Sequence, residues 1–251
     1  MTEPPDHPRP VSPSWWPPAP GADTADPIPA GRGRPPLPVD EILTEAFALL
    51  SEGGIEGLGM RALARRLGSS TSTLYRQFPG GKDELCARLA EQVMTEIVDE
   101  IANADLGEDW AEIVERSATI SFDVLRRRPH SAALFADQVH FGPMGVVRYE
   151  VSLQLLLAAG LSPTEAAAAD HALARLIVGY ALQSPQVASP SRYTVSEFYG
   201  RLDPDEFPSV TTVLPALPED LRAEFLFALR TFMAGLRLLA ADTADVPDGS
   251  P

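Results

Sequence analysis

Residues 57–82 read GLGMRALARRLGSSTSTLYRQFPGGK, and this stretch decides the fold. Its first part has the apolar spacing of a short helix over residues 60–67, which Gly68 ends. The hydroxyl side chains at positions 69–71 can cap a second short helix that runs to Phe78. Two short helices joined by a tight turn that contains glycine predict a helix-turn-helix.

Helical periodicity extends from this stretch in both directions. Upstream, Ile42, Ala46 and Leu50 are spaced by four residues, and Gly53 with Gly54 supplies a C-terminal stop. The alternation typical of strands bounded by hairpin turns is absent from the sequence, so the predicted fold class is all-α. The remaining helices are predicted over residues 82–101, 109–127, 130–140, 143–159, 163–184 and 219–241, with a proline-interrupted connection at 186–218 that holds a short helix near 195–200.

The charge of the chain is unevenly distributed. The whole sequence carries 20 Lys and Arg against 35 Asp and Glu, a formal net charge of −15, which by itself argues against a polyanionic partner. Residues 1–90 hold 9 basic and 11 acidic residues, a balance of −2, whereas residues 91–251 hold 11 and 24, a balance of −13. Residues 57–82 hold five basic residues and no acidic one. This cationic island suits contacts to phosphates, and a solvated basic helix face is the open alternative.

The chain divides into four parts. Residues 1–38 hold 13 of the 25 prolines, and we expect an extended, mostly disordered tail there. Residues 39–88 form the predicted helix-turn-helix domain, and residues 89–243 form a larger helical domain. Residues 244–251 are expected to be a frayed end.

Composition excludes several classes of protein. No apolar run is long enough to span a membrane, and no signal peptide is recognisable, so we expect no membrane partner. The single cysteine, Cys86, excludes an intrachain disulfide and a multi-cysteine metal site, and it fits the reducing cytoplasm. Motifs of nucleophilic hydrolases, phosphate loops and dinucleotide-binding loops are absent from the sequence, which argues against an enzyme.

Three motifs carry a resemblance to a known family: MRALARRLG at residues 60–68, TLYRQFP at 73–79 and KDEL at 82–85. With their spacing, residues 39–89 resemble the DNA-binding domain of the tetracycline-repressor (TetR) family. A weaker resemblance to the C-terminal domains of that family covers residues 106–185 and rests on Trp110, the RRRPH turn at 126–130, Gly142-Pro143, the AGLS turn at 159–162 and Gly179.

Two positions depart from the family pattern. Gly59 stands where a hydroxyl residue is usual, which weakens a helix cap by at most a few tenths of a kcal/mol. Ser69 stands where an apolar residue is usual, so either the turn is looser or the hydroxyl faces DNA. Neither departure breaks the resemblance.

The helix from residue 70 to Phe78 is expected to enter the major groove, where its early residues meet base edges. Small hydroxyl side chains give adaptable base contacts, Arg76 suits a strong contact to guanine or phosphate, and Tyr75 suits a phosphate. Arg61 and Lys82 are expected to clamp phosphates. The predicted DNA-binding residues of the helix-turn-helix are Arg61, Ser70, Thr71, Ser72, Thr73, Tyr75, Arg76 and Lys82. The neighbouring Arg65 and Arg66 either lie in solvent or pair with Glu52, Glu56 or Asp83.

A second basic feature lies just upstream. Residues 31–35 read GRGRP and resemble an AT-hook core, which implies that Arg32 and Arg34 enter an A·T-rich minor groove beside the main site. A linker that happens to hold two arginines is the open alternative.

The helices predicted over residues 163–184 and 219–241 are too apolar for surface helices with one buried face. The family resemblance implies that they pair with the same helices of a second subunit in a four-helix bundle, and internal core is the alternative. The predicted dimerisation residues are Leu173, Leu176, Ile177, Phe225, Leu229, Phe232 and Leu236.

The resemblance also implies a ligand cavity among the helices of the larger domain. Its candidates combine apolar walls with scattered polar groups, although each of them also fits packing or surface. They are Phe122, Leu134, Phe135, Gln138, His140, Phe141, Arg148 and Tyr180. The histidines lack the spacing of metal ligands, so we expect no metal and no cofactor.

The function that follows is a ligand-responsive transcriptional regulator. We expect a cytoplasmic repressor that binds a palindromic double-stranded DNA operator as a homodimer and is released by a small-molecule inducer. One alternative is an all-helical small-molecule-binding protein or enzyme with no role on DNA. A second is an architectural DNA-binding protein that takes no ligand.

Overall fold

The computed structural model describes residues 36–136, 142–183, 195–217 and 220–244. It is helical, and no β-strand occurs in these ranges, so the predicted all-α class is confirmed. None of the described helices is both long enough and apolar enough to cross a membrane.

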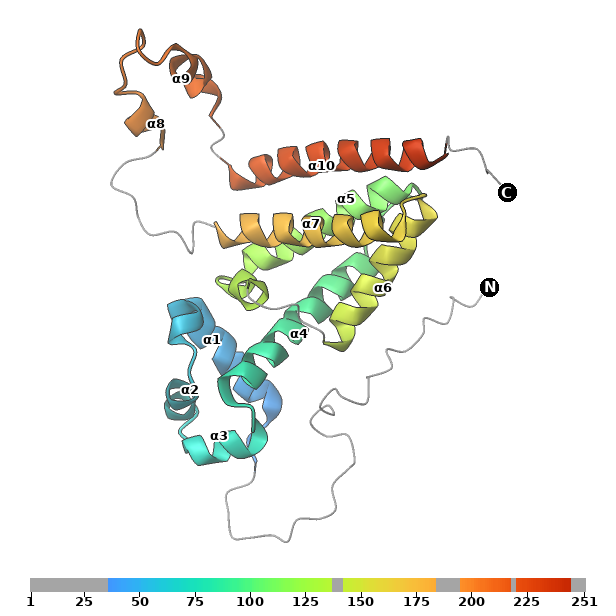
Figure 1. The fold of residues 1–251 in the computed structure, drawn as a ribbon. Coiled ribbons are helices and arrows are strands. Elements are labelled where there is room, and N and C mark those ends of the chain that lie inside the picture. Colours follow the sequence, from blue (N-terminus) through green and yellow to red (C-terminus); the bar gives the residue numbers. More distant parts are fainter. Residues whose placement is uncertain (1–35, 137–141, 184–194, 218–219, 245–251) are drawn as a thin grey trace, which may run out of the picture.

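The first three helices and the start of the fourth form the helix-turn-helix head, which lies at one end of the molecule (Figure 1). These helices fold together because each contributes apolar side chains to one buried cluster, of which Leu63, Leu74 and Leu85 are fully buried. The head consists of α1 (Val39–Gly57), α2 (Met60–Arg66), α3 (Thr71–Gln77) and the N-terminal part of α4 (Gly81–Ala102).

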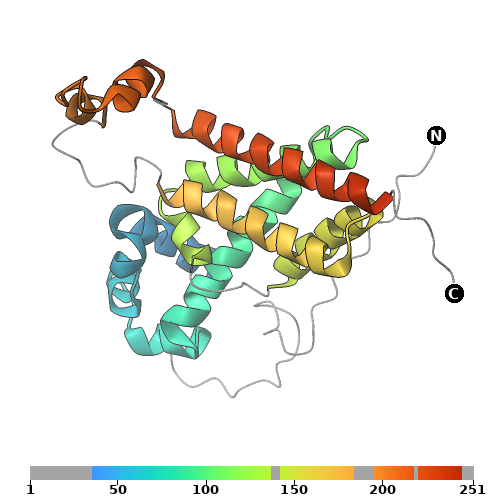
Figure 2. The ribbon, with the colours of Figure 1, turned by 45° about the horizontal axis from the view of Figure 1, so that its top comes forward.

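Helix α4 leaves the head and enters the helical body, so one continuous helix joins the two parts (Figure 1). The body has a second core in which the rings of Phe122 and Phe225 stack with their centroids 4.1 Å apart. Helices α7 and α10 lie side by side at the end of the molecule opposite α3, as both views show (Figure 2). The body consists of α5 (Trp110–Arg127), the 3₁₀ helix η1 (Ser131–Phe135), α6 (Pro143–Ala158), α7 (Pro163–Leu182) and α10 (Leu221–Ala244).

Between α7 and α10 a small extension stands away from the body in both views. The sequence predicted one short helix near residues 195–200 in this connection, and α8 is found there. It did not predict the helical residues that follow. The extension contains α8 (Val195–Tyr199), α9 (Pro208–Val213) and η2 (Leu214–Ala216).

The glycines predicted to stop the first helix do interrupt it. The backbone of Gly54 is not helical and has a φ of 61° that only glycine adopts readily, and a short helical piece beyond this break continues α1 to Gly57. In its described part, the helix predicted over residues 130–140 is instead the 3₁₀ helix η1 (Ser131–Phe135), which begins after His130 with a left-handed φ of 63°. Residues 137–140 of this prediction lie outside the described residues.

Candidate nucleic-acid interface

Helix α3 is capped by its own hydroxyl side chains. The Oγ atom of Ser70 accepts the backbone N–H of Thr73 at 3.1 Å, as predicted for a cap at this position. The same Oγ lies 2.9 Å from Oγ1 of Thr73, and Nη2 of Arg76 donates to that Oγ1 at 3.4 Å. Three of the predicted DNA-binding residues are thus linked in a row along one side of α3.

The opposite side of α3 is anchored in the core. Leu74 and Phe78 are 0% and 1% exposed, in agreement with their four-residue spacing. Ser72, Tyr75 and Arg76 are exposed, and the half-buried Thr71 and Thr73 lie between the two faces. The structure therefore presents a polar row on a rigidly held helix, which is the geometry that insertion into a major groove requires.

Tyr75 is held by its packing against a glycine. Gly81 has a φ of 64°, and a Cβ atom added there would lie 3.0 Å from Cε1 of Tyr75. The absence of a side chain at Gly81 lets the ring lie against the start of α4 while half of its surface stays in solvent.

The arginines of α2 have separate roles. Arg66 forms ion pairs with Glu45 and Glu52 at 2.5 and 2.8 Å, so the sequence alternative of pairing with Glu52 is the one found. Hydrogen bonds from these two carboxylates, first Glu52 and then Glu45, raise the pKa of the Arg66 guanidinium. Arg61 and Arg65 are exposed, and no ion pair or hydrogen bond joins either side chain to the described residues. Both are therefore available to phosphates.

Lys82 has a structural contact that the sequence did not predict. Its Nζ donates to the backbone carbonyl oxygen of Ile55 at 2.7 Å, which joins the start of α4 to the last turn of α1. This bond occupies one of the three ammonium donors. A phosphate contact by Lys82 remains a prediction that uses the other two.

Gln77 is a residue that the sequence reasoning missed. Its side-chain amide forms two reciprocal hydrogen bonds with the backbone of Leu37, in which Nε2 donates to the carbonyl oxygen at 2.7 Å and Oε1 accepts the N–H at 3.2 Å. The chain before α1 is thereby fixed to the C-terminal end of α3. No local pattern signals this contact, because the two residues are 40 positions apart.

Several predicted site residues lie outside the described residues. They are Arg32 and Arg34 of the GRGRP segment and the ligand candidates Gln138, His140 and Phe141.

The predicted dimerisation residues divide between core and surface. Phe225 and Leu229 are 0% exposed and Leu236 is 5% exposed, so for these three the alternative of internal core is correct. The apolar side chains that α10 exposes are instead Phe227, Leu238 and Leu239, a position or two away on the helix. Half-buried residues of the predicted set remain accessible to a partner, namely Leu173, Leu176, Ile177 and Phe232.

The ligand candidates are not brought together in one described cavity. Phe122 is fully buried, and the edge of the Tyr180 ring meets the ring of Phe225 with centroids 5.7 Å apart, so these two line the aromatic core. Leu134 is buried and Phe135 half-buried where η1 meets both cores.

Arg148 has a structural contact that the sequence did not predict. Its guanidinium binds both carboxylate oxygens of Asp170, at 2.9 and 3.1 Å, and Ser152 donates to the same carboxylate at 2.7 Å. Asp170 is 2% exposed, so this pair fixes α6 to α7 inside the body. The prediction that Arg148 faces a ligand is therefore not supported by its contacts.

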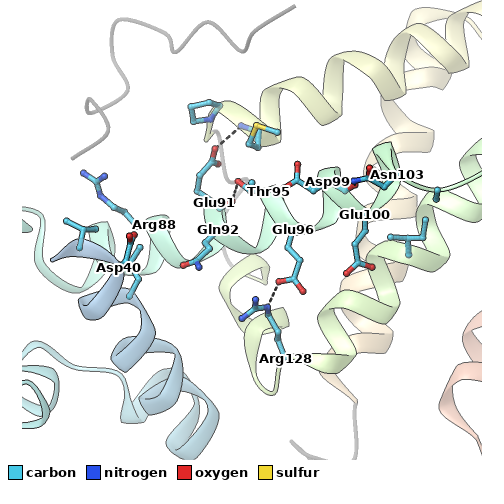
Figure 3. Close-up of a pocket in the computed structure, with 16 residues that line it drawn as sticks. Asp40, Arg88, Glu91, Gln92, Thr95, Glu96, Asp99, Glu100, Asn103 and Arg128 are labelled. Atoms are coloured by element: carbon cyan, nitrogen blue, oxygen red, sulfur yellow. Dashed lines mark hydrogen bonds and ion pairs between the residues drawn. The ribbon is translucent and has the colours of Figure 1, made fainter. Parts of the chain in front are cut away.

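A groove of about 1060 Å³ runs along α4, and none of the ligand candidates that the structure describes lines it (Figure 3). Its walls come from α1, α4, α5 and the start of α6, so it touches both the head and the body. At one wall the carboxylate of Glu91 accepts the backbone N–H of Met144 at 2.9 Å, and burial raises the pKa of this carboxyl group. At another, Arg128 pairs with Glu96, and its guanidinium lies 4.9 Å from the ring centroid of Phe47.

Comparison with family models agrees with this architecture. A model described as "Bacterial regulatory proteins, tetR family" matches residues 42–89. A second model, described as "Tetracyclin repressor-like, C-terminal domain", matches residues 103–239. A similar protein, "HTH-type transcriptional repressor DrrR1" of Streptomyces coeruleorubidus, is 28% identical over 224 residues, which cover 83% of this chain and 80% of that protein.

Solved structures show the same fold. The apo form of ActR from Streptomyces coelicolor is 26% identical with a TM-score of 0.70, over 84% of this chain and 99% of that one. ActR in complex with actinorhodin is 27% identical with a TM-score of 0.68, over 82% of this chain and 99% of that one.

Proposed function

Because the chain belongs to the TetR family of bacterial transcriptional regulators, we propose that it represses transcription by binding a two-fold symmetric DNA operator as a homodimer and leaves the operator when a small-molecule inducer binds. The chain is a ligand-responsive DNA-binding regulator and not an enzyme. Its place of action is the cytoplasm, where the operator lies.

The observation that carries this proposal is the polar row of α3. Ser72, Tyr75 and Arg76 project from a helix whose other face is fixed in the core, and Arg61 and Arg65 flank it without partners among the described residues. Hydroxyl and arginine side chains supply the base and phosphate contacts of such a helix in the major groove. Lys82 and the hydroxyl residues 70–73 complete the proposed site.

Residues 31–35 are proposed to add a minor-groove contact. The two hydrogen bonds between Gln77 and Leu37 fix the chain two positions after the end of this segment to the C-terminal end of α3, which supports a contact beside the proposed DNA surface. Arg34 is three positions before Leu37, which limits its distance from that anchor to about 10 Å for an extended chain. Arg32 and Arg34 are thus within reach of the groove next to the one that α3 enters.

Dimerisation is proposed through α7 and α10. On α10, Phe227 and Leu238 are 67% and 68% exposed and lie on the same face with Ala234. On α7, the exposed Ala168 and Ala172 allow close approach of another helix. A bundle of these helices from two subunits would cover both faces and would hold two α3 helices for successive major grooves.

The inducer acts by binding one arrangement of the two heads better than the other. A ligand with equal affinity for both arrangements would shift nothing, and near-complete release requires a difference of roughly 5.5 kcal/mol. ActR, a similar protein, has been solved with actinorhodin bound, which supports a small organic effector for this chain. The helical body, including the aromatic side chains of Phe122 and Tyr180, is the proposed location of its site.

The proposal is tested by mapping the DNA fragments that the full chain binds across the genome, followed by gel-shift titration of the strongest fragment. We expect a two-fold symmetric site whose affinity falls when the inducer is added. Binding without any sequence preference at moderate salt would contradict the proposal. Selective binding that no metabolite of the neighbouring genes alters would favour an architectural protein instead.

A further inference from the structure

The groove along α4 carries an excess of negative charge. Its lining contains five carboxylates and two guanidinium groups, a balance of −3. On α4, the side chains of Glu91 and Asp99 point to one side of the helix and those of Glu96 and Glu100 to the other, as Figure 3 shows, and Asp40 comes from the first turn of α1. The charged lining residues are Asp40, Glu91, Glu96, Asp99, Glu100, Arg88 and Arg128.

Some of these carboxylates already have partners. Glu96 pairs with Arg128, and Glu100 pairs with Arg127. Arg88 is occupied by Glu84 at 3.1 Å and lies 5.8 Å from the ring centroid of Phe78.

Two carboxylates of the groove are not neutralised in this way. Within the described part of the chain, no hydrogen bond or ion pair reaches the side chain of Asp40 or of Asp99. Both side chains are labelled in Figure 3, at separate points along the groove. Two uncompensated charges along one groove favour an occupant with two positive charges at a comparable spacing.

The chain itself carries such a segment immediately before the groove. Residues 31–35 hold Arg32 and Arg34 and no acidic residue. The chain becomes fixed at Leu37 and then passes through Val39 and Asp40, which are themselves part of the groove wall. The occupant is therefore tethered at the mouth of the site that fits it, so its effective concentration there is high.

The length of the tether is sufficient. The chain is fixed at Leu37, three positions after Arg34 and five after Arg32, so an extended chain allows about 10 and 17 Å from that anchor, and the long arginine side chains add to this reach. From Glu91 to Asp99, the groove follows α4 for eight residues, or about 12 Å of helix. The apolar part of the lining, which includes Leu43 and Met144, can receive the methylene stems of the arginines and the ring of Pro35.

We propose that the GRGRP segment docks in the acidic groove of α4 when the protein is not on DNA. Arg32 and Arg34 then pair with Asp40 and Asp99 and are withheld from nucleic acid. Binding of DNA and docking in the groove compete for the same two arginines, so the groove suppresses non-specific attraction to DNA. The docking contact itself does not depend on the proposed DNA-binding function.

Trypsin measures the docking directly. Within residues 1–38 the bonds after Arg9 and Arg34 precede proline and resist trypsin, which leaves the Arg32–Gly33 bond as its one cleavable site there. The rate of its cleavage in the full chain, followed by intact mass, reports how often the segment is undocked. We expect the double variant Asp40→Asn with Asp99→Asn to be cleaved about fivefold faster, the factor that two exposed ion pairs supply together.

A matched variant removes the same charge outside the groove. Glu41→Gln with Asp83→Asn also neutralises one carboxylate in the first turn of α1 and one on α4, and neither residue lines the groove. This control is expected to be cleaved at the wild-type rate. Equal cleavage rates for the wild type, the groove variant and the control overturn the proposal.

A small cation is the competing occupant, and tetraphenylphosphonium is the probe for it. If the GRGRP segment fills the groove, a chain that lacks residues 1–36 binds this cation more tightly than the full chain does, because a competitor has been removed. The opposite result is that the deletion leaves cation binding unchanged while Asp40→Asn with Asp99→Asn abolishes it. This result overturns docking of the GRGRP segment and assigns the groove to a lipophilic cation.

Affinity for non-specific DNA gives a second readout. Neutralising Asp40 and Asp99 is expected to tighten this binding about fivefold more in the wild-type background than in a chain with Arg32→Ala and Arg34→Ala. An equal gain in both backgrounds, together with equal trypsin rates, contradicts the proposal. If the wild-type chain binds no DNA but the groove variant is still cleaved faster by trypsin than the wild type, only the proposed function is contradicted.

Discussion

Arg76 is the arginine of the proposed interface that lies on α3 itself. Its contact to Thr73 holds the guanidinium over the polar row, where it can meet a base edge. We expect Arg76→Ala to weaken binding to the selected operator by roughly 1 to 3 kcal/mol while non-specific binding changes little. Competition gel shifts with operator and scrambled DNA measure the difference.

The control for this prediction is Arg65→Ala on α2. That side chain is exposed and is expected to touch phosphate only, so its loss lowers affinity for both DNAs alike and makes the salt dependence less steep by about one unit. Equal loss on both DNAs for Arg76→Ala would show that this residue contacts phosphate and not a base.

Replacing either partner of the Arg148–Asp170 pair is expected to lower the unfolding free energy, but by different amounts. Removal of the arginine by Arg148→Met leaves a carboxylate buried without its cation, because Asp170 is only 2% exposed. We expect this variant to lose about 3 kcal/mol of unfolding free energy. Asp170→Asn should cost less, because the Arg148 side chain is 31% exposed and can turn to water.

Urea unfolding of both variants measures which of them loses more unfolding free energy. The protein concentration is kept fixed, because association changes the apparent stability. A larger loss for Asp170→Asn than for Arg148→Met would contradict it.

At the scale of elements, the break in α1 depends on one glycine. Gly54 has a φ of 61°, and a Cβ atom there would lie 3.3 Å from Nδ1 of His130. Gly54→Ala is therefore expected to destabilise the protein by about 1 to 2 kcal/mol. Gly53→Ala is the matched control, because nothing lies within 4 Å of an added Cβ at that position. Thermal unfolding that ranks the two variants equally would refute the argument.

The start of α7 is held by a capping box. The Oγ of Ser162 accepts the backbone N–H of Glu165 at 3.3 Å, and the Glu165 carboxylate accepts from the backbone N–H and the hydroxyl of Ser162 at 2.9 and 2.6 Å. These hydrogen bonds, first the one from the hydroxyl, hold the pKa of Glu165 below its ordinary value of 4.5. Ser162→Ala should cost about 1 kcal/mol at neutral pH.

The cost of Ser162→Ala should depend on pH in a fixed direction. The pKa of Glu165 is lower in the folded chain than in the unfolded chain. The ionised carboxylate therefore contributes to the free energy of unfolding above pH 4.5, and this contribution is lost as the pH falls through the pKa of the folded state. The gap in unfolding free energy between wild type and variant should therefore narrow in acid. A gap that widens between about pH 7 and about pH 3 would contradict this assignment.

At the scale of the whole molecule, the exposed side of α10 predicts how two subunits associate. Phe227 and Leu238 are each about two-thirds exposed, an unusual position for large apolar side chains on a monomer. Phe227→Glu with Leu238→Glu should convert the proposed dimer to monomer in sedimentation velocity. Val151→Glu, at a 58% exposed position on α6, is expected to leave the dimer intact.

The sequence predicted the head well because its information is local. Spacing of four residues placed Leu74 and Phe78 in the core, and the hydroxyl run at residues 69–71 contained the true cap, Ser70. The body was predicted less well, because apolar helices there have two buried faces and periodicity does not say which one meets a partner. Phe225 and Phe227 illustrate this, since the first proved to be core and the second surface.

Contacts between residues far apart in the chain could not be predicted from the sequence. Lys82 was predicted from its residue type to contact phosphate and Gln77 was not singled out, whereas the structure joins both side chains to backbone groups of other segments. The groove along α4 was missed because its carboxylates resemble an ordinary solvated helix face when only α4 is considered. It becomes a groove only when α1, α5 and α6 supply the other walls.

The capping of α3 limits how much information this protein can read from DNA. Ser70 is engaged at the cap and Gln77 with Leu37, so few side chains of the helix are left to distinguish one base from another. A base contact by Arg76 discriminates by about 1 to 3 kcal/mol, which specifies only a small part of a half-site. In the proposed dimer, much of the selectivity for an operator must then come from the distance between two degenerate half-sites, which the subunit pair would set at about 34 to 36 Å. Its operators should consequently vary in sequence while their spacing stays constant.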